Sequence, residues 1–405
     1  MTTKLHLPGD PGYDLHRAAL SPTVDSRPAM IMEAMEPADI GLAVTTARDL
    51  DLPFAVQATG HGTWQPVDHG VLLKTGSLAD VLIDPDRRIA TVGPGTRWGA
   101  VLSAAAPYGL APLSGSSPDV GVVGYTLGGG MGWLARRYGL AADSVLRAEV
   151  VTADGQTVTV TPHRHPDLFW AVRGGGGNFG VVASLEFRLY PVSQVVTAVA
   201  TFPIEAAADV LDHYRGWADA APDSASTAVL LGSEGVVVKA MSTDLTGRAL
   251  RPLWRGAARI DRRVASYAKA KMGGISPRYQ DFFQHLTDGD IATIVAAHRE
   301  NGTTVEIRHW GGAIATAAAD AGPAGHRGAP FSVTLDNPGS NLPTGIGAVF
   351  YNFLCDPSRV EDAFTRENLR RLQGVKRAYD PTNFFHVNHN ITPAPTPAAL
   401  AGTTT

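Results

Sequence analysis

Apolar positions along the first half of the chain switch between helical and alternating spacing. In PADIGLAVTTARDLDL, residues 37–52, they recur every three or four positions behind Asp39, which predicts an amphipathic helix. WGAVLSAAAPYGL, residues 98–110, has the same spacing and predicts a helix that ends at Gly109. Short apolar runs bounded by turn residues predict strands, which lie at 54–57, 71–75, 79–95 (with a turn at Asp84–Asp86) and 145–161 (a hairpin turning at Asp154–Gly155).

The pattern changes near residue 192. Residues 167–191, DLFWAVRGGGGNFGVVASLEFRLYP, predict a helix, a glycine run and an alternating strand. Beyond them glycine clusters vanish, and longer helical and strand-like segments take over. The predicted helices are 206–221, 247–301 (interrupted) and 359–379, and the predicted strands are 226–231, 235–243, 303–313, 330–335 and 347–354. This block predicts an antiparallel sheet with helices on one side.

One stretch shows neither the helical nor the alternating spacing of apolar residues. Residues 115–138, GSSPDVGVVGYTLGGGMGWLARRY, carry seven glycines with apolar residues between them. Glycine weakens helices and strands and is favoured where the backbone passes very close to something else. On its own, the stretch is equally compatible with a turn that packs two strands and with the wall of a cofactor site.

Composition narrows the class of protein. The chain has 405 residues, enough for two or three domains, with 44% hydrophobic and 18% charged residues, as in a soluble globular protein. A net charge of -4 gives no reason to expect nucleic acid or an anionic membrane as partner. No run of about 18 apolar residues predicts a membrane span, and the N-terminus lacks a signal-peptide core. The single Cys355 excludes an intramolecular disulfide, and together these features predict a cytoplasmic protein.

The glycine run GGGGNFG contains a GxGxxG at Gly175, Gly177 and Gly180. A dinucleotide fingerprint requires a strand before this motif, a helix after it, and an acidic residue about 20 positions on. Here a predicted helix precedes the motif, a predicted strand follows it, and the acidic residue is missing. The motif is therefore not a Rossmann site.

His61 lies in ATGHG, where small residues leave successive backbone amides uncovered. Such amides form a nest that suits a pyrophosphate. The histidine could be an ordinary hydrogen-bonding residue, a metal ligand or the attachment point of a cofactor, and its chemistry alone favours the ordinary role. The close pairs His386 with His389 and His163 with His165 lack acidic or cysteine partners, so no metal site is predicted.

Four motifs together resemble a known family. They are QATGHGTW, GSSPDVGVVGYTLGGGMGWLARRYGLAADSV, FWAVRGGGGNFGVV and YDPTNFFHVNHNI, which stand in order and at family spacing within residues 25–191 and 345–391. They resemble the berberine-bridge-enzyme-like branch of the vanillyl-alcohol-oxidase superfamily, which are flavoproteins with a PCMH-type FAD-binding domain. The resemblance favours the cofactor interpretation of both His61 and the glycine stretch.

The resemblance implies an α+β fold with a divided cofactor domain. The PCMH-type FAD-binding domain, with two α/β subdomains, would comprise residues 1–191 and 376–405, and the family's C-terminal segment would cover about 345–391. Residues 192–375 would form the substrate domain, whose antiparallel sheet, flanked by helices, lies over the flavin ring. The tail beyond about residue 394 is expected to be disordered.

The resemblance also implies the residues of the FAD site. His61 would be bonded to the flavin 8α-methyl, and its turn would hold the pyrophosphate. The glycine stretch would run beside the adenine, the diphosphate and the ring, residues 174–182 would close over the cofactor, and two asparagines would meet the flavin. The implied cofactor-binding residues, besides His61, are Thr59, Gly60, Gly62, Ser116, Ser117, Val120, Gly121, Gly124, Tyr125, Gly128, Gly129, Gly130, Gly132, Gly177, Gly180, Val181, Val182, Asn388 and Asn390.

Three positions refine this expectation. Many relatives attach the flavin a second time through a cysteine, and Ser117 occupies that position here. A serine has no comparable route to a thioether, and Cys355 lies in the middle block, so a single attachment through His61 is expected. Val120 matches the family's oxygen-gate position, where valine leaves a path for O2 and favours an oxidase over a dehydrogenase.

The catalytic base departs from the family pattern. Phe353 stands where the family commonly has a tyrosine. Tyr351, two residues earlier on the predicted strand, would point to the same face, where it could act as the base or merely line the pocket. His309 is a second candidate, and by alternation it and Arg308 face opposite sides. His326 is a weaker one.

The implied function is an FAD-linked oxidase. It would take a hydride from a C–H next to an alcohol, amine or phenol of a small molecule, such as a sugar or a secondary metabolite, with O2 as acceptor giving H2O2. The alternatives are a redox-neutral cyclisation, a dehydrogenase, or a flavin-binding protein without turnover. No metal, nucleic acid or membrane is expected as partner, and the sequence leaves the oligomeric state open.

Overall fold

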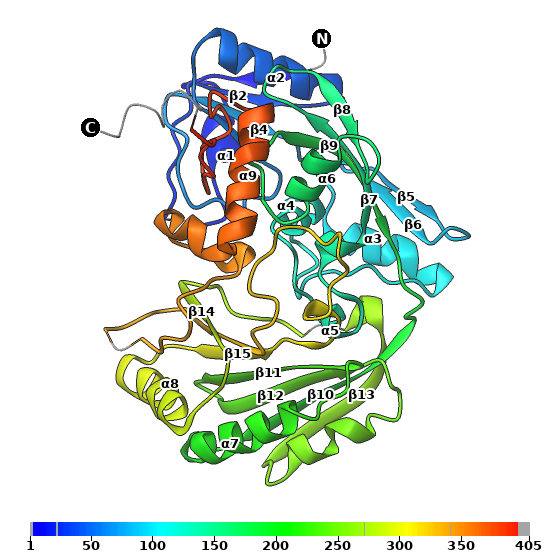
Figure 1. Cartoon of the computed structure of the whole chain (residues 1–405), viewed down its shortest axis with the longest axis vertical. Helices are drawn as coiled ribbons and strands as arrows, with labels where there is room; N and C mark the ends of the chain where they lie inside the picture. Colours follow the sequence, from blue (N-terminus) through cyan, green and yellow to red (C-terminus); the bar gives the residue numbers. More distant parts are fainter. Residues whose placement is uncertain (1–2, 22, 271, 341, 396–405) are drawn as a thin grey trace.

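The strands of the protein form three sheets in two layers of the molecule (Figure 1). The structure is a computed structural model that describes residues 3–21, 23–270, 272–340 and 342–395. Two smaller sheets lie in the upper part of the view and the largest lies below them. The helices are α1 (Tyr13–Arg17), α2 (Ala38–Asp49), α3 (Trp98–Ala105), α4 (Val122–Leu127), α5 (Ala135–Tyr138), α6 (Pro166–Val172), α7 (Ala207–Ala218), α8 (Asp288–Asn301) and α9 (Arg366–Tyr379).

The first sheet has four strands in the order β1-β2-β4-β3. Its strands are β1 (Lys4–His6), β2 (Met30–Glu33), β3 (Phe54–Gln57) and β4 (Val71–Lys74). The predicted helix at 37–52 is confirmed as α2, whose buried Ile40, Ala43, Val44 and Ala47 follow helical spacing and pack with the strands. Strand β3 of this sheet ends directly before the turn that carries His61.

The second sheet has five antiparallel strands in the order β5-β6-β9-β7-β8. Its strands are β5 (Val81–Asp84), β6 (Ile89–Val92), β7 (Val145–Val151), β8 (Thr157–Val160) and β9 (Val181–Arg188). Its core includes residues of α3, α4, α6 and α9. Val349, Leu354 and Phe364 belong to the same core, so the chain has returned to this part of the molecule before α9. The predicted boundaries at residues 191 and 376 stay predictions.

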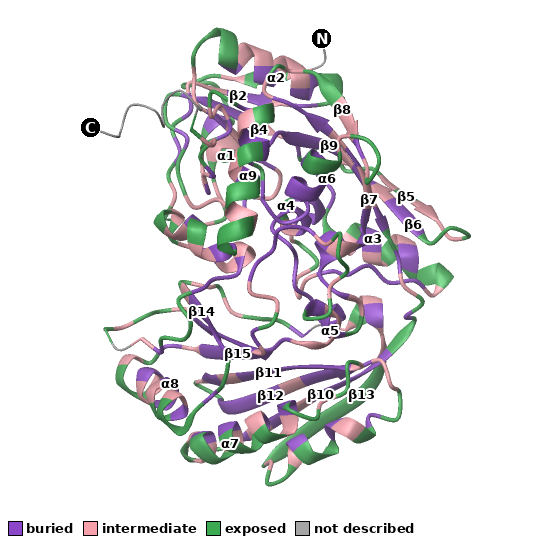
Figure 2. Ribbon diagram, viewed as in Figure 1, coloured by how far each residue is buried: buried purple, intermediate pink, exposed green. Residues whose placement is uncertain are grey.

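The third sheet has seven antiparallel strands in the order β13-β10-β12-β11-β15-β16-β14. Its strands are β10 (Gln194–Phe202), β11 (Ala225–Gly232), β12 (Gly235–Ser242), β13 (Arg259–Ser266), β14 (Tyr279–Phe283), β15 (Val305–His309) and β16 (Phe331–Leu335). Helices α7 and α8 cover one face (Figure 1). The other face packs against residues of the glycine stretch and its neighbours, including Leu113 and Trp133. Figure 2 shows that α4 and α5, between the sheets, are largely buried.

Two predicted elements are wrong. The interrupted helix at 247–301 is a helix only at α8, because the segment also contains a 3-10 helix, Arg248–Trp254, and the strands β13 and β14. Strand β13 pairs with β10 at the edge of the sheet, and six of its eight residues are exposed, so it shows no apolar alternation. Its sequence therefore lacks the pattern by which a strand is predicted.

The predicted strand at 347–354 is also wrong. Tyr351–Phe353 form a 3-10 helix, and the helix expected at 359–379 begins only at Arg366, after Thr365, whose hydroxyl accepts from the Asn368 amide. The buried carboxylate of Asp281 on β14 accepts hydrogen bonds from the amides of Gly345, Gly347 and Ala348. These contacts bend the chain away from the sheet, so the alternation argument that placed Tyr351 and Phe353 on one face does not apply.

Candidate functional site

The turn that follows β3 of the first sheet carries His61 near the molecular surface. Gly60 has φ +77°, a conformation that favours glycine, and a Cβ there would lie 2.5 Å from the Gln57 side chain. His61 is half-buried, and its Nδ1 lies 3.0 Å from the Thr59 hydroxyl, which fixes the ring. Burial, with a smaller contribution from Arg97, lowers the pKa of His61 and keeps the imidazole neutral near pH 7.

Asn388 holds the loop that follows His61. Its Oδ1 accepts hydrogen bonds from the amides of Trp64 (2.8 Å) and Gln65 (3.3 Å), and its Nδ2 donates to the Gly62 carbonyl (2.9 Å). Both polar atoms of the side chain are therefore engaged with the loop. These hydrogen bonds give the side chain of Asn388 a supporting role, and its expected contact with the flavin stays a prediction.

Asn352 holds the glycine stretch in the same manner. Its Oδ1 accepts from the Gly130 amide (2.8 Å), and its Nδ2 donates to the Tyr125 carbonyl (3.0 Å). A Cβ at Gly128 would lie 2.5 Å from Asn352 Nδ2. Gly128 is thus required by the approach of this asparagine, and the stretch is fixed from the side of the third sheet.

Asn178 forms a third link of this kind. Its Oδ1 accepts from the Ile391 amide (2.8 Å), and its Nδ2 donates to the Gly175 carbonyl (2.9 Å) and to the Tyr351 hydroxyl (3.3 Å). Asn388, Asn352 and Asn178 each join the C-terminal segment, residues 344–391, to one of the earlier segments that carry the predicted site. We call these three residues the asparagine clamps.

Three glycines mark an open path along the clamped segments. Gly62, Gly124 and Gly177 are exposed, although α4 and the glycine run around the last two are almost wholly buried, and a Cβ at any of the three would meet no atom. Contacts connect them along the path. A Cβ at Gly121 would touch Thr59, and the Gly176 amide donates to the Leu127 carbonyl (2.9 Å).

This path fits FAD. Backbone that is bare of side chains accommodates a flat ring or a diphosphate at close range. The Asn390 Oδ1 and the Tyr125 hydroxyl are buried with no hydrogen-bond partner among the described residues, and a bound cofactor or substrate could supply one. The structure thus supplies both room and unsatisfied polar groups near the predicted cofactor residues.

Other predicted cofactor residues also contact protein. A Cβ at Gly129, Gly130, Gly132 or Gly180 would lie within 3.0 Å of Phe350, Tyr125, the Ser114 carbonyl or Val150, respectively. These glycines are needed for packing on at least one side. The remaining predicted residues are also engaged through a side chain or the backbone. Ser116 accepts from Trp133 Nε1 (3.0 Å), Ser117 accepts from the Asp119 amide (3.3 Å), the Val120 carbonyl accepts from the Trp98 amide, and Val181 and Val182 are buried in β9.

The face of the third sheet turned toward the glycine stretch carries a polar cluster. Arg308 Nη2 lies 3.1 Å from Glu306 Oε1, and both side chains are almost fully buried. Arg308 also approaches the sulfur of Met131 in the glycine stretch (3.7 Å) and the ring of Phe353. Glu306 pairs across the sheet with Thr334, which pairs with Gln280, so the three share this face.

Three polar atoms of this cluster lack partners. Gln280 Nε2, Thr334 Oγ1 and Arg308 Nε are buried and make no hydrogen bond to any described residue. An unsatisfied buried polar group costs about 1–3 kcal/mol, so such groups on one face indicate a missing ligand. Sequence reasoning did not find Glu306, Gln280 or Thr334. The available signal was Glu306 and Arg308 two residues apart on one strand, which places both on one face.

The two predicted catalytic residues lie elsewhere. His309 is on the opposite face of β15, where its ring packs against Phe331 and Trp217 under α7, and burial lowers its pKa to about 3. The Tyr351 hydroxyl points away from the sheet, to Asn178 and the His389 carbonyl (3.5 Å), and burial raises its pKa. The expected opposition of Arg308 and His309 is confirmed. Arg308 reaches Met131 in the middle of the glycine stretch (3.7 Å), whereas His309 Nε2 lies 3.1 Å from Nη1 of Arg136 near the end of that stretch.

His326, the weaker candidate, is also buried, and burial lowers its pKa. Its ring lies 6.1 Å from that of Phe282, and its Nε2 has no hydrogen-bond partner among the described residues.

Comparisons with known proteins agree with this architecture. Residues 28–161 match the family described as FAD binding domain, and residues 344–392 match the family described as Berberine and berberine like. The chain is 26% identical to (R)-6-hydroxynicotine oxidase of Paenarthrobacter nicotinovorans over 95% of this chain and 96% of that protein.

Solved structures share the fold at lower identity. BBE-like 1 of Physcomitrella patens superposes with a TM-score of 0.87 at 19% identity, covering 98% of each chain. A glucooligosaccharide oxidase of Acremonium strictum, described with a 6-S-cysteinyl, 8α-N1-histidyl FAD, has a TM-score of 0.84 at 22% identity, covering 97% of this chain and 98% of that one. Among the described residues, no helix has the length and apolar character needed to cross a membrane.

Fold, site and comparisons define the class of protein, which is an FAD-dependent oxidoreductase with a PCMH-type cofactor domain. Within that class the chain matches both segments that the resemblance to berberine-bridge-enzyme-like proteins predicts, the FAD-binding segment at 28–161 and the berberine-like C-terminal segment at 344–392.

The open path can be tested at Gly177. In Gly177→Leu the new side chain would enter the space next to the glycine run, and overpacking costs about 1–3 kcal/mol, or roughly five- to 150-fold in affinity for FAD. The measurement is a titration of FAD into apoprotein in a His61→Ala background, which avoids covalent trapping. Gly216→Leu on α7, where a Cβ would also meet no atom, is the control. Equal affinities in the two variants would contradict the assigned path.

Proposed function

We propose that FAD is attached covalently to this chain through His61 alone. The observations that support it are the neutral, half-buried imidazole at the start of the open glycine path and the loop fixed by Asn388. Gly62 and Gly177 leave bare backbone for the diphosphate and the ring. A second attachment would require a thiolate, which is the reactive form of cysteine.

The only cysteine is unsuited to that second attachment. Cys355 Sγ lies 3.1 Å from the Pro277 carbonyl and 3.2 Å from the Phe353 carbonyl, to which the thiol can donate. Burial raises its pKa to about 12, so it remains a thiol at neutral pH. Ser117, at the position where relatives carry the cysteine, offers only a hydroxyl that already accepts from the Asp119 amide. These features favour a single link.

Acid precipitation tests the attachment. The flavin of the wild-type protein is expected to remain in the pellet, whereas that of His61→Ala is expected to pass entirely into the supernatant, because a covalent bond survives denaturation and a bound cofactor does not. His163→Ala, at an exposed histidine, is the matched control and should retain a yellow pellet. A colourless pellet from flavin-loaded wild-type protein would rule out the His61 link.

We further propose that the enzyme oxidises a small alcohol, amine or phenol. When bound, FAD supplies N5 as acceptor of a hydride from the adjacent C–H, with O2 as final acceptor giving H2O2. The chain must then accept the proton of the substrate O–H or N–H. The observation that carries the proposal is the polar cluster, where a buried carboxylate and three unpartnered polar atoms share the face turned toward the glycine stretch.

Glu306 is the residue best placed to accept the proton. Its carboxylate is held by Arg308 Nη2, and both are enclosed between the third sheet and the glycine stretch. Gln280 Nε2 and Arg308 Nε would donate hydrogen bonds to a substrate oxygen or nitrogen, and Thr334 Oγ1 could donate or accept. A substrate with several polar groups, such as a sugar or a hydroxylated heterocycle, fits this cluster.

The reaction class is tested by flavin spectroscopy. Alcohols, amines, sugars and phenols are first screened for conversion of the compound, whether or not H2O2 is released. A substrate found in this way is expected to bleach the flavin absorbance under anaerobic conditions, and air should restore it. Conversion of a compound without bleaching would support a redox-neutral reaction, and bleaching that air does not reverse would support a dehydrogenase.

A further inference from the structure

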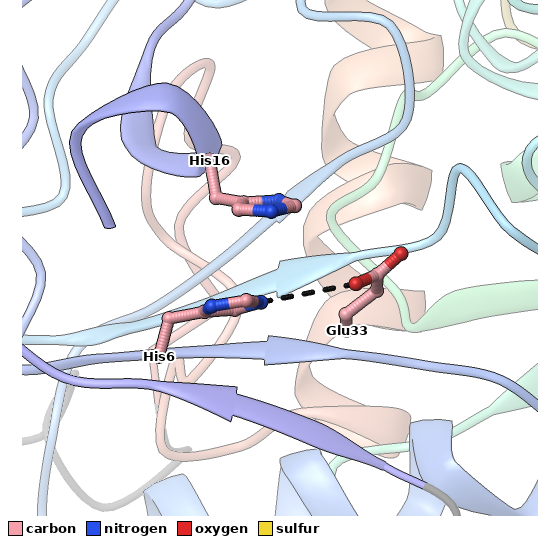
Figure 3. Close-up of side chains that lie close together, drawn as sticks. All are labelled: His6, His16 and Glu33. Carbon is pink, nitrogen blue, oxygen red and sulfur yellow. Dashed lines mark ion pairs between the residues drawn. The ribbon is translucent and has the colours of Figure 1, made fainter. Parts of the chain in front are cut away.

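The N-terminal part of the chain brings together two imidazoles and a carboxylate, away from the glycine path. His6 comes from β1, His16 from α1 and Glu33 from β2 (Figure 3). One nitrogen of each histidine and one oxygen of the glutamate lie within 4.8 Å of one another. Neither the proposed oxidation nor the FAD path uses these residues.

The local fold places the three side chains. In the antiparallel pair β1–β2, Lys4 lies opposite Glu33 and His6 opposite Ile31, so His6 and Glu33 project from one face of the sheet. Helix α1 lies over this face because buried Tyr13 donates its hydroxyl proton to the Pro28 carbonyl (2.5 Å). One turn later His16 stacks on His6, with ring centroids 4.1 Å apart and planes inclined by 20°.

The polar groups of this cluster are incompletely satisfied. His6 Nε2 is buried and makes no hydrogen bond to a described residue, and it points at Glu33 Oε2 across 3.8 Å, which is too far for a hydrogen bond. The other carboxylate oxygen accepts from the Ser77 hydroxyl (2.7 Å), which fixes its orientation. A group between the ring and the carboxylate would satisfy both.

Two lysines also approach the carboxylate. Lys4 Nζ lies 3.9 Å from Glu33 Oε2, but its side chain is 59% exposed and can turn into solvent. Lys74 is the neighbour of Glu33 on β4. An exposed ion pair of this kind contributes about 0–1 kcal/mol to stability, so Lys4 would compete only weakly with another ligand of the carboxylate.

We propose that His6, His16 and Glu33 form a binding site for a divalent transition metal, best suited to Zn²⁺. Two imidazoles and one carboxylate are a common ligand set for Zn²⁺, with bonds of about 2.0–2.2 Å and a water in the fourth position. Binding would require the two stacked rings to tilt until both nitrogens point at the metal, which rotation about the Cβ–Cγ bonds provides. Solvent reaches the site at the half-buried His16.

The site lies behind the cofactor turn. The chain that leaves α1 is bound by Gln57 Nε2, which donates to the Ala18 carbonyl (2.9 Å), and a Cβ at Gly60 would lie 3.0 Å from the Leu20 amide nitrogen. A metal that ties α1 to β1 and β2 would therefore hold the segment against which the His61 turn packs. Its role would be structural.

Calorimetric titration of ZnCl2 into the untagged, EDTA-treated, FAD-loaded protein tests the proposal. We expect one Zn²⁺ per chain, with affinity reduced at least about 100-fold in the double variant His6→Gln/His16→Gln, because loss of metal ligands costs more than the 10–100-fold lost with supporting residues. Glu33→Gln, which preserves shape, should also weaken binding and serves if the double variant does not fold.

Replacement of a distant histidine provides the control. His163→Gln, at an exposed position, should bind Zn²⁺ as the wild type does. Co²⁺ bound in place of Zn²⁺ should give visible absorption typical of a tetrahedral site, seen as a difference spectrum above the flavin bands. Wild-type protein that takes up no Zn²⁺, or variants at His6, His16 and Glu33 that bind it unchanged, would overturn the proposal.

Discussion

Glu306→Gln is expected to slow the anaerobic reduction of the flavin by substrate by about 10²–10⁴-fold, the usual contribution of a positioned general base. Glutamine keeps the size of the side chain and can still meet Arg308, but it cannot accept the substrate proton. The rate is measured by stopped-flow absorbance at saturating substrate, so that weaker binding does not contribute.

The sequence-based candidates provide the comparison. Tyr351→Phe and His309→Gln should each change the rate much less, because the Tyr351 hydroxyl faces Asn178 and His309 packs under α7 on the far side of the sheet. If Tyr351→Phe lost 100-fold while Glu306→Gln reacted normally, the base would be the tyrosine and the polar cluster would serve binding only.

Lys376→Met is expected to lower the free energy of unfolding by about 3–5 kcal/mol, the effect of breaking a buried ion pair at one partner. Lys376 and Asp380 are both fully buried, and Lys376 Nζ donates to Asp380 Oδ2 (2.6 Å), to the Asn178 carbonyl (2.8 Å) and to the Phe385 carbonyl (2.9 Å). Methionine would leave the carboxylate and two carbonyls without this donor.

The change is measured as the shift of the urea midpoint, followed by tryptophan fluorescence. Arg370→Met, at an exposed cation on the same helix, should change stability by no more than about 0.5 kcal/mol. Asp380 also accepts from the amides of Phe384 and Phe385, so Asp380→Asn should be destabilising as well. A Lys376→Met protein as stable as the Arg370→Met protein would show that the pair contributes little.

Periodicity predicted the fold best where one face of an element is buried and the other exposed. Helix α2 satisfies this condition, and its position was predicted correctly. Strand β13 does not, because most of its residues are exposed, and it was predicted as helix. The 3-10 helix at Tyr351 replaced an expected strand because Asp281, some 70 positions earlier, binds the backbone before it. No local pattern contains such a long-range contact.

The cofactor side of the site was more accessible to sequence reasoning than the substrate side. Glycine has a distinctive backbone and His61 a distinctive ring chemistry. Both lie in short motifs of consecutive residues, which can be recognised in the sequence. Glu306, Gln280 and Thr334 come from three strands and meet only because the sheet pairs them. Charged residues on a strand are ordinarily read as its exposed face. Glu306 and Arg308 are buried because β15 lies between β11 and β16 and its inner face meets the glycine stretch.

The asparagine clamps bear on how the protein is made. The His61 loop, the glycine stretch and the 174–178 run leave the ribosome well before the segment that fastens them, because Asn352, Asn388 and the Ile391 amide all belong to the last 60 or so residues. A nascent chain without that segment contains the residues of the glycine path but lacks the contacts by which the three asparagine clamps fasten them. Flavin capture should therefore be a late, post-translational event, and a stop codon before residue 344 should yield a chain that never turns yellow.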